Sequence, residues 1–158
     1  MKLHKNKENF IEAVQATSRG LNISPALVEK DYYVTLVLNK INEEVPGLIF
    51  KGGTSLSKCH KVINRFSEDI DLTLDSEHLT EGQRKKVKST IVKICEELEL
   101  TISNLENTRS RRDYNCYQIS YPLLFENDEI DPIIKVETVF MQECYPEEVK
   151  QADSLIGE

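Results

Sequence analysis

The sequence predicts an α+β domain in which helices pack against a mixed β-sheet. Three observations lead to this fold class. Two segments with helical spacing of apolar residues open the chain, two short strands that are each followed by a helix come next, and a run of strand candidates follows them. With 158 residues, the chain is long enough to bury the core of one domain.

The two leading helices are predicted from apolar spacing and from capping residues. Residues 6–19 form the first, and Gly20 is expected to end it in the left-handed conformation. The second is predicted to begin at Ser24, as the N-cap, with Pro25 in the first helical position. Pro46, which is followed by glycine, is expected to end this helix.

The remaining elements follow from short apolar runs, turn residues and a capping box. The predicted order is a strand at 48–50, a short helix from Thr54 to about His60, a strand at 70–74, a long helix that Thr80 and Gln83 open, and strands at 100–107, 114–124 and 132–141. The polar turn from Arg109 to Asp113 is expected to join the first two of these last strands as a hairpin.

Composition limits the class of protein. No apolar run reaches membrane-spanning length, and the basic start of the chain lacks the apolar core of a signal peptide, so we expect a cytoplasmic protein with no membrane partner. The net charge of −7 argues against a basic coat for non-specific nucleic-acid binding, but leaves room for a local basic groove. The candidates for such a groove are Arg84, Lys85, Lys86, Lys88, Lys93, Arg109, Arg111 and Arg112.

The most informative motif combines a glycine turn with two spaced acids. Gly52 and Gly53 lack side chains, so backbone N–H groups there can approach a polyphosphate. Asp69 and Asp71 are expected to share one face of a strand. Two neighbouring carboxylates disfavour each other's ionised forms, and a divalent cation relieves that repulsion. Because Mg²⁺ is usually held by one or two carboxylates and substrate phosphates, the pattern indicates nucleotidyl transfer.

Each half of this motif has a plainer explanation when it is taken alone. A Gly-Gly turn between a strand and a helix is most often only a turn, and an edge strand can show acids to water. Their order on two consecutive short strands makes the combination more specific than either part.

The residues that carry this motif resemble a known family. The runs 50–58 and 65–72 resemble the AbiEii-type nucleotidyltransferase toxins of bacterial abortive-infection and toxin–antitoxin systems, which belong to the DNA polymerase β-like nucleotidyltransferase superfamily. Residues 28–35 also resemble that family's leading helix. The resemblance is close over about 20–75 and looser to about 140. Two departures from the wider superfamily pattern are Lys51, where a hydrophobic residue is usual, and a longer gap before the acids.

The resemblance implies a polymerase-β-like core with a mixed sheet, flanking helices and two leading helices. It predicts one nucleotidyltransferase domain over 1–158, with a helical part at 1–46 and a catalytic core at 47–141. A helical C-terminal portion that the family carries is not recognisable here, because the sequence turns acidic and polar from Pro146 onward. We therefore expect the chain to be a fragment or the product of a split gene.

The resemblance also implies the site residues. The catalytic residues and ligands for Mg²⁺ or Mn²⁺ are expected to be Asp69, Asp71 and a third carboxylate, for which Glu137 is the first candidate and Asp131 the fallback. The plainer reading of Glu137 is an ion pair with Lys135 on the same strand face. The expected nucleotide-binding residues are Gly52, Gly53, Thr54, Ser55, Lys58, Arg65 and Ser67.

Alternatives remain open at two of these positions. Ser67 either is a target for antitoxin-directed modification or supports the turn into the strand. Arg65 contacts a phosphate or pairs with Glu68 at the surface.

Two further segments of the second helix each allow two interpretations. Tyr32 and Tyr33 can stack on a base, but core packing is the favoured reading. Residues 29–31, Glu-Lys-Asp, are expected to form a solvated or ion-paired turn.

The activity implied by the resemblance is transfer of a nucleoside monophosphate from an NTP to an acceptor, with RNA and in particular the tRNA 3′ end favoured. The protein would then be the toxin of a toxin–antitoxin or abortive-infection system, with a cognate antitoxin as partner. The alternative from another functional class is a non-catalytic nucleotide-binding, RNA-binding or antitoxin-binding module derived from a truncated toxin.

Overall fold

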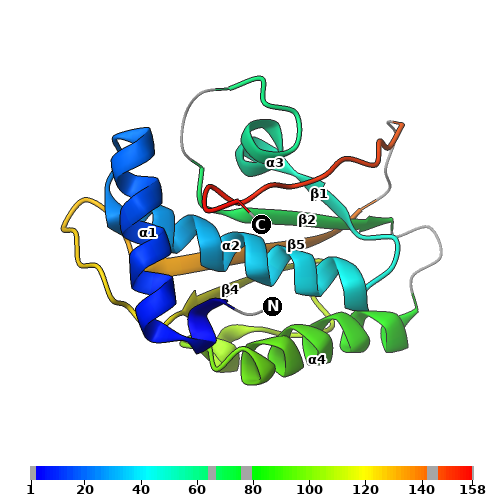
Figure 1. The fold of residues 1–158 in the computed structure, drawn as a ribbon. Helices are drawn as coiled ribbons and strands as arrows, with labels where there is room; N and C mark the ends of the chain where they lie inside the picture. Colours follow the sequence, from blue (N-terminus) through cyan, green and yellow to red (C-terminus); the bar gives the residue numbers. More distant parts are fainter. Residues whose placement is uncertain (1–2, 64–66, 76–79, 142–145, 158) are drawn as a thin grey trace.

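The computed structural model describes residues 3–63, 67–75, 80–141 and 146–157 (Figure 1). Its helices are α1 (Lys7–Leu21), α2 (Pro25–Glu44), α3 (Gly52–Lys58) and α4 (Glu81–Glu97), with two 3₁₀ turns, η1 (Leu3–Lys5) and η2 (Leu105–Asn107). Its strands are β1 (Ile49–Lys51), β2 (Ile70–Asp75), β3 (Thr101–Ile102), β4 (Tyr114–Ser120) and β5 (Ile133–Met141).

The five strands form one mixed sheet in the order β1-β2-β5-β4-β3. Strands β2 and β5 are parallel, whereas the β1–β2, β5–β4 and β4–β3 pairs are antiparallel. The sheet and its helices confirm the predicted α+β class with a mixed sheet. The parallel pair in the middle brings two acid-bearing strands side by side.

The two faces of the sheet differ in character. Ile70 and Leu72 of β2 and Ile134 and Val136 of β5 are fully buried in the core. Helices α2 and α4 pack together over this face, and α1 packs on α2 (Figure 1). Because side chains alternate along a strand, the residues between these apolar positions, among them Asp71, project to the opposite face.

The leading helices form where the sequence predicts them, but the first one ends later. Gly20 remains inside α1, and Asn22 takes the left-handed conformation with φ 55° and ψ 47°. Asparagine tolerates this conformation better than most residues with a side chain, so the cap prediction was wrong by two positions. Ser24 and Pro25 open α2 as predicted, although the Ser24 hydroxyl accepts a hydrogen bond from Asn127 at 3.0 Å and makes no capping bond.

Three other boundaries differ from the prediction. Helix α3 begins at Gly52 instead of Thr54, so the two glycines form its first turn. The predicted strand at 100–107 pairs over only two residues before η2, because the Asn104 side chain takes over the next bonds to β4. Its amide donates to the Cys116 carbonyl at 2.9 Å, and its oxygen accepts from the Gln118 N–H at 2.9 Å. Strand β4 ends at Ser120, four residues earlier than predicted.

The capping box of α4 is confirmed. The Thr80 N–H donates to the Gln83 side chain at 2.8 Å, and the Gln83 N–H donates to the Thr80 hydroxyl at 3.3 Å. Within the described residues, no helix has both the length and the apolar character to cross a lipid bilayer.

Candidate active site

The second acid of the motif packs directly against the glycine turn. Gly52 has φ +77°, a conformation that residues with side chains rarely adopt. A Cβ atom at this position would lie 2.8 Å from Asp71 Cγ and closer still to its Oδ2. The antiparallel β1–β2 pair sets this contact by placing Lys51 opposite Asp71. Glycine is therefore required here both by the backbone and by the carboxylate beside it.

A second carboxylate lies beside Asp71 on the neighbouring strand. In the parallel β2–β5 ladder, Asp71 is the register partner of Glu137, so both half-buried side chains occupy the same face. Burial raises the pKa of Asp71, Glu137 and Asp69 raise it further by repulsion, and Lys51 opposes the rise. Glu137 and Asp69 are thus close enough to Asp71 to disfavour its ionised form.

Asp69 occupies a different environment from Asp71. It lies one residue before β2, is exposed, and lines an open hollow of about 300 Å³. The other residues around this hollow are Lys30, Ser67, Glu68, Asp131, Ile133 and Lys135. Asp131, the fallback for the third carboxylate, therefore lies beside Asp69, whereas Glu137 is the residue opposite Asp71.

The carboxylates form an oxygen-only donor set, which suits Mg²⁺ or Mn²⁺. Among the residues that the structure describes, no three His, Cys, Asp or Glu side chains are grouped tightly enough to make a ready-made metal site. Mg²⁺ commonly takes only one or two protein carboxylates, with substrate oxygens and water completing its shell. The pair formed by Asp71 and Glu137, with Asp69 nearby, fits this requirement.

The predicted nucleotide-binding hydroxyls and lysine have protein partners. Thr54 is buried and donates to the Ser67 hydroxyl at 2.9 Å, which ties α3 to the segment before β2. The Lys58 ammonium is buried against the Asp31 carboxylate. Arg65 lies outside the described residues. Contact of these side chains with a nucleotide remains a prediction.

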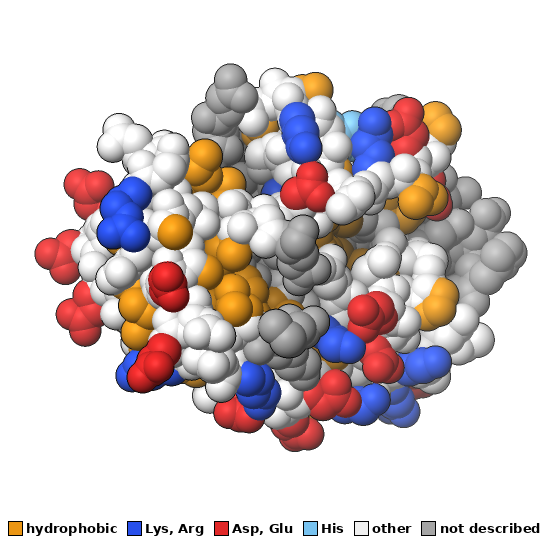
Figure 2. Space-filling model, viewed as in Figure 1, with side chains coloured by type: hydrophobic (Ala, Val, Ile, Leu, Met, Phe, Trp, Pro, Cys, Tyr) orange, Lys and Arg blue, Asp and Glu red, His pale blue; other side chains and the backbone are white. Residues whose placement is uncertain are grey.

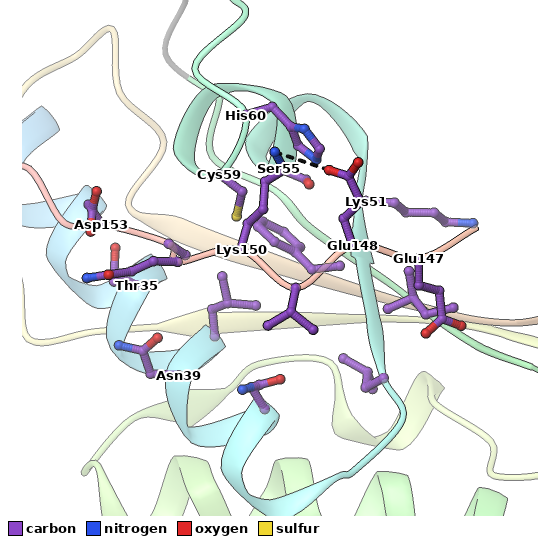
Figure 3. Close-up of a pocket in the computed structure, with 18 of the residues that line it drawn as sticks. Thr35, Asn39, Lys51, Ser55, Cys59, His60, Glu147, Glu148, Lys150 and Asp153 are labelled. Carbon is purple, nitrogen blue, oxygen red and sulfur yellow. Dashed lines mark ion pairs between the residues drawn. The ribbon is translucent and has the colours of Figure 1, made fainter. Parts of the chain in front are cut away.

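Ser55 lines a second, larger hollow of about 1170 Å³ between α2, β1, α3 and residues 146–157. Figure 3 shows Thr35 and Asn39 projecting into it from α2, opposite the side chains of the C-terminal segment. Within that segment, Lys150 pairs with Glu148 at 3.1 Å, and its Asp153 pairs with Lys61 at 3.1 Å. Neither Asp69 nor Asp71 lines this hollow, although Lys51, the register partner of Asp71, does.

Three consecutive charged residues of α2 are buried, which the sequence prediction partly missed. Glu29, Lys30 and Asp31 are only 0%, 1% and 3% exposed, so the solvated alternative is wrong. The ion-paired alternative is correct for Lys30 and Asp31, although the three residues lie within α2 and not in a turn. Glu29 accepts from the backbone N–H groups of Leu124 and Phe125, each at 3.0 Å. Burial raises the Glu29 pKa, and these two bonds counteract the rise.

The two residues that follow Glu29, namely Lys30 and Asp31, bind other segments of the chain. Lys30 pairs with Glu68 and donates to the Asp131 carbonyl. Asp31 pairs with Lys58, and its other oxygen accepts from the Leu155 N–H at 2.7 Å. A signal in the sequence was available, because three charges in a row on an otherwise apolar helix cannot all face water.

Tyr114 and Cys116 of β4 are site residues that the sequence analysis did not identify. Cys116 is the register partner of Glu137, and Tyr114 lies diagonally from Glu137 on the same face. Burial, followed by the charge of Glu137, raises the pKa of Tyr114 to about 12 and also raises that of Cys116. In contrast, Tyr32 and Tyr33 are buried in the core, as favoured from the sequence.

Four of the eight basic residues proposed as a groove pair with acids that the structure describes, namely Arg84, Lys85, Lys93 and Arg111. Arg84 pairs with Asp113, and both Lys85 and Arg111 pair with Glu81, the last at 3.0 Å. In Figure 2, Lys and Arg side chains alternate with Asp and Glu along the edge formed by α4. This surface is of mixed charge.

The sequence comparisons agree with the arrangement of these strands and acids. A model of the family described as "Nucleotidyl transferase AbiEii toxin, Type IV TA system" matches residues 37–158, which include the glycine turn and all three carboxylates. Comparisons with curated proteins and with solved structures gave no match. The chain belongs to the AbiEii nucleotidyl transferase toxin family of type IV toxin–antitoxin systems.

Proposed function

We propose that this chain is a toxin that uses Mg²⁺ or Mn²⁺ to transfer a nucleoside monophosphate from an NTP to an acceptor hydroxyl. The observation that carries the proposal is the contact of the Asp71 carboxylate with Gly52, with Glu137 beside it on the parallel strand. A glycine turn for phosphates and a pair of carboxylates for a cation then lie at one point of the sheet.

Asp71, Glu137 and Asp69 are the residues that would hold the metal. When bound, the ion would neutralise polyphosphate charge and stabilise the entering and leaving oxygens of the displacement. Burial, and after it repulsion from Glu137 and Asp69, raises the pKa of Asp71. This supports the assignment, because a bound cation would relieve the repulsion.

The protein's own groups would orient the substrates and move one proton. Backbone N–H groups at Gly52 and Gly53 would cradle the phosphates, with Ser55 and Ser67 as hydroxyl donors nearby. The acceptor oxygen attacks the α-phosphorus, the bond from this phosphorus to the bridging oxygen breaks, and pyrophosphate leaves. Glu137 would accept the proton of the attacking hydroxyl, because it lies beside Asp71 on the same face.

We favour RNA, and in particular the tRNA 3′ end, as the acceptor, and a cognate antitoxin as the protein partner. The net charge of −7 and the pairing of Arg84, Lys85 and Arg111 with acids reduce the number of cations that are available to RNA phosphates. Binding of tRNA should therefore fall only gently as salt rises, with a slope that corresponds to a few phosphate contacts.

The test is to incubate the chain with each labelled NTP, total tRNA and Mg²⁺, and to repeat it with Asp71→Asn. Label should reach RNA with the wild-type protein only, and a chelator should abolish the transfer. Nucleotide binding without transfer to RNA or protein would instead support the non-catalytic module. Transfer by Asp71→Asn at the wild-type rate would refute the proposed site.

A further inference from the structure

We propose that Lys30 is a positioning residue for the acidic site. Its buried ammonium holds Glu68, the neighbour of Asp69, and at the same time holds the chain just before the strand that carries Glu137. This inference rests on the proposed function, because it assigns Lys30 a role in presenting the carboxylates to a cation.

The first argument is the burial of the lysine. Lys30 is almost fully buried, and a buried ammonium is costly unless it is paired and hydrogen-bonded. It meets this need with Glu68, 38 residues later, and with the Asp131 carbonyl, 101 residues later. Glu68 is about one-third exposed, so it extends from the surface to reach the lysine. The ion pair therefore links a rigid core helix to a surface segment.

The second argument is where the two partners lie. Glu68 is two residues before β2, and Asp131 is two residues before β5. These strands are parallel neighbours whose register places Asp71 beside Glu137. One ammonium thus fixes the starts of both acid-bearing strands from a single point on α2. Lys30 also lines the 300 Å³ hollow with Asp69, so its effect on that carboxylate is local.

The neighbouring residue Glu29 provides a matched comparison. It lies on the same helix, is as deeply buried, and also holds a distant segment. That segment, at Leu124 and Phe125, follows β4 and carries none of the proposed ligands. Loss of the Glu29 charge should therefore loosen the fold without changing the acid site.

The experiment compares Lys30→Met, Lys30→Arg, Glu68→Gln and Glu29→Gln with the wild-type chain. Mn²⁺ binding is measured by electron paramagnetic resonance without nucleotide, and hydrogen exchange of residues 67–73 is measured without metal. Thermal unfolding is recorded for every variant. Glu68→Gln changes the same ion pair at a side chain that is partly in water, so the inference can still be tested if Lys30→Met does not fold.

We expect Lys30→Met and Glu68→Gln to weaken Mn²⁺ binding roughly 10- to 100-fold, the usual effect of removing a residue that orients a metal ligand. Exchange of residues 67–73 should rise in both. Lys30→Arg should recover most of the affinity, and Glu29→Gln should lower the melting temperature without changing the affinity.

Wild-type affinity in folded Lys30→Met or in Glu68→Gln would overturn the inference, as would an equal loss in Glu29→Gln. In that case the proposed function still stands if Asp71→Asn abolishes Mn²⁺ binding. If the wild-type chain binds no Mn²⁺ with or without NTP, the metal-dependent function and this inference both fail.

Discussion

Substituting alanine for Gly52 tests the contact on which the site depends. The new methyl group would lie 2.8 Å from Asp71 Cγ, far inside contact distance, so the carboxylate would have to move. The backbone there has φ +77°, which alanine adopts with strain. Gly47 offers a matched control, since it has φ +79° but a methyl group added there would meet no heavy atom of the described residues within 4 Å, its chain neighbours aside.

The two variants separate backbone strain from displacement of the acid. Left-handed backbone costs a residue with a side chain about 1–2 kcal/mol, and this applies to both sites. Forcing a methyl group into a filled space costs a further 1–3 kcal/mol, roughly, and this applies only to Gly52. We therefore expect a loss of about 2–5 kcal/mol for Gly52→Ala and about 1–2 kcal/mol for Gly47→Ala.

Urea unfolding of both variants measures these losses, and Mn²⁺ binding measures displacement of Asp71. Gly52→Ala should bind Mn²⁺ and nucleotide poorly even where it is fully folded, whereas Gly47→Ala should bind both normally. Equal stability losses together with unchanged Mn²⁺ binding in Gly52→Ala would refute the argument that Asp71 rests on this glycine.

Three further predictions concern charged groups. Asp69→Ala and Asp71→Ala should each abolish metal-dependent transfer while the far-ultraviolet circular dichroism stays unchanged, and activity in either variant would contradict the scheme. Because burial and acidic neighbours raise the folded-state pKa of Asp71 above its usual 3.8, ionising this group costs stability. Without metal, the free energy of unfolding of the wild-type chain should therefore fall relative to that of Asp71→Asn as the pH rises from below 3.8 through the raised pKa. A difference in this free energy that stays constant at all pH values would exclude the prediction. Lys58→Met leaves the buried Asp31 without its cation and should lower the free energy of unfolding, measured in urea, by roughly 3 kcal/mol. This is the low end of the usual range, because Asp31 keeps its hydrogen bonds from the C-terminal segment. Lys40→Met, which removes an exposed ion pair, should change little, and a similar loss in both would refute the burial argument.

The features that the sequence predicted well are local. The capping box at Thr80 depends on residues three apart, and the Ser24-Pro25 helix start depends on adjacent ones. The closeness of Asp71 to the glycine turn also follows from local order, because each lies in a short motif, whereas their role in catalysis stays a prediction. Their meeting required only that two consecutive strands pair.

The features that the sequence did not predict depend on distant partners. Nothing near Lys30 in the chain indicates that its partners are Glu68 and Asp131. Likewise, Cys116 and Tyr114 join the site only because β4 pairs with β5, a register that no local pattern fixes. The left-handed cap was misplaced because Gly20 and Asn22 both tolerate that conformation, and α1 continues through Gly20 to Leu21.

The bonds of Asp31 have a consequence for the order in which the protein assembles during synthesis. Its second oxygen is satisfied by Ser154 and Leu155, 123 and 124 residues further along the chain. A ribosome that has produced α2, the sheet and α3 still holds a nascent protein whose inner carboxylate lacks these donors. Closure of this segment over Asp31 is then a late event, because a contact between residues so far apart in the sequence closes a long loop.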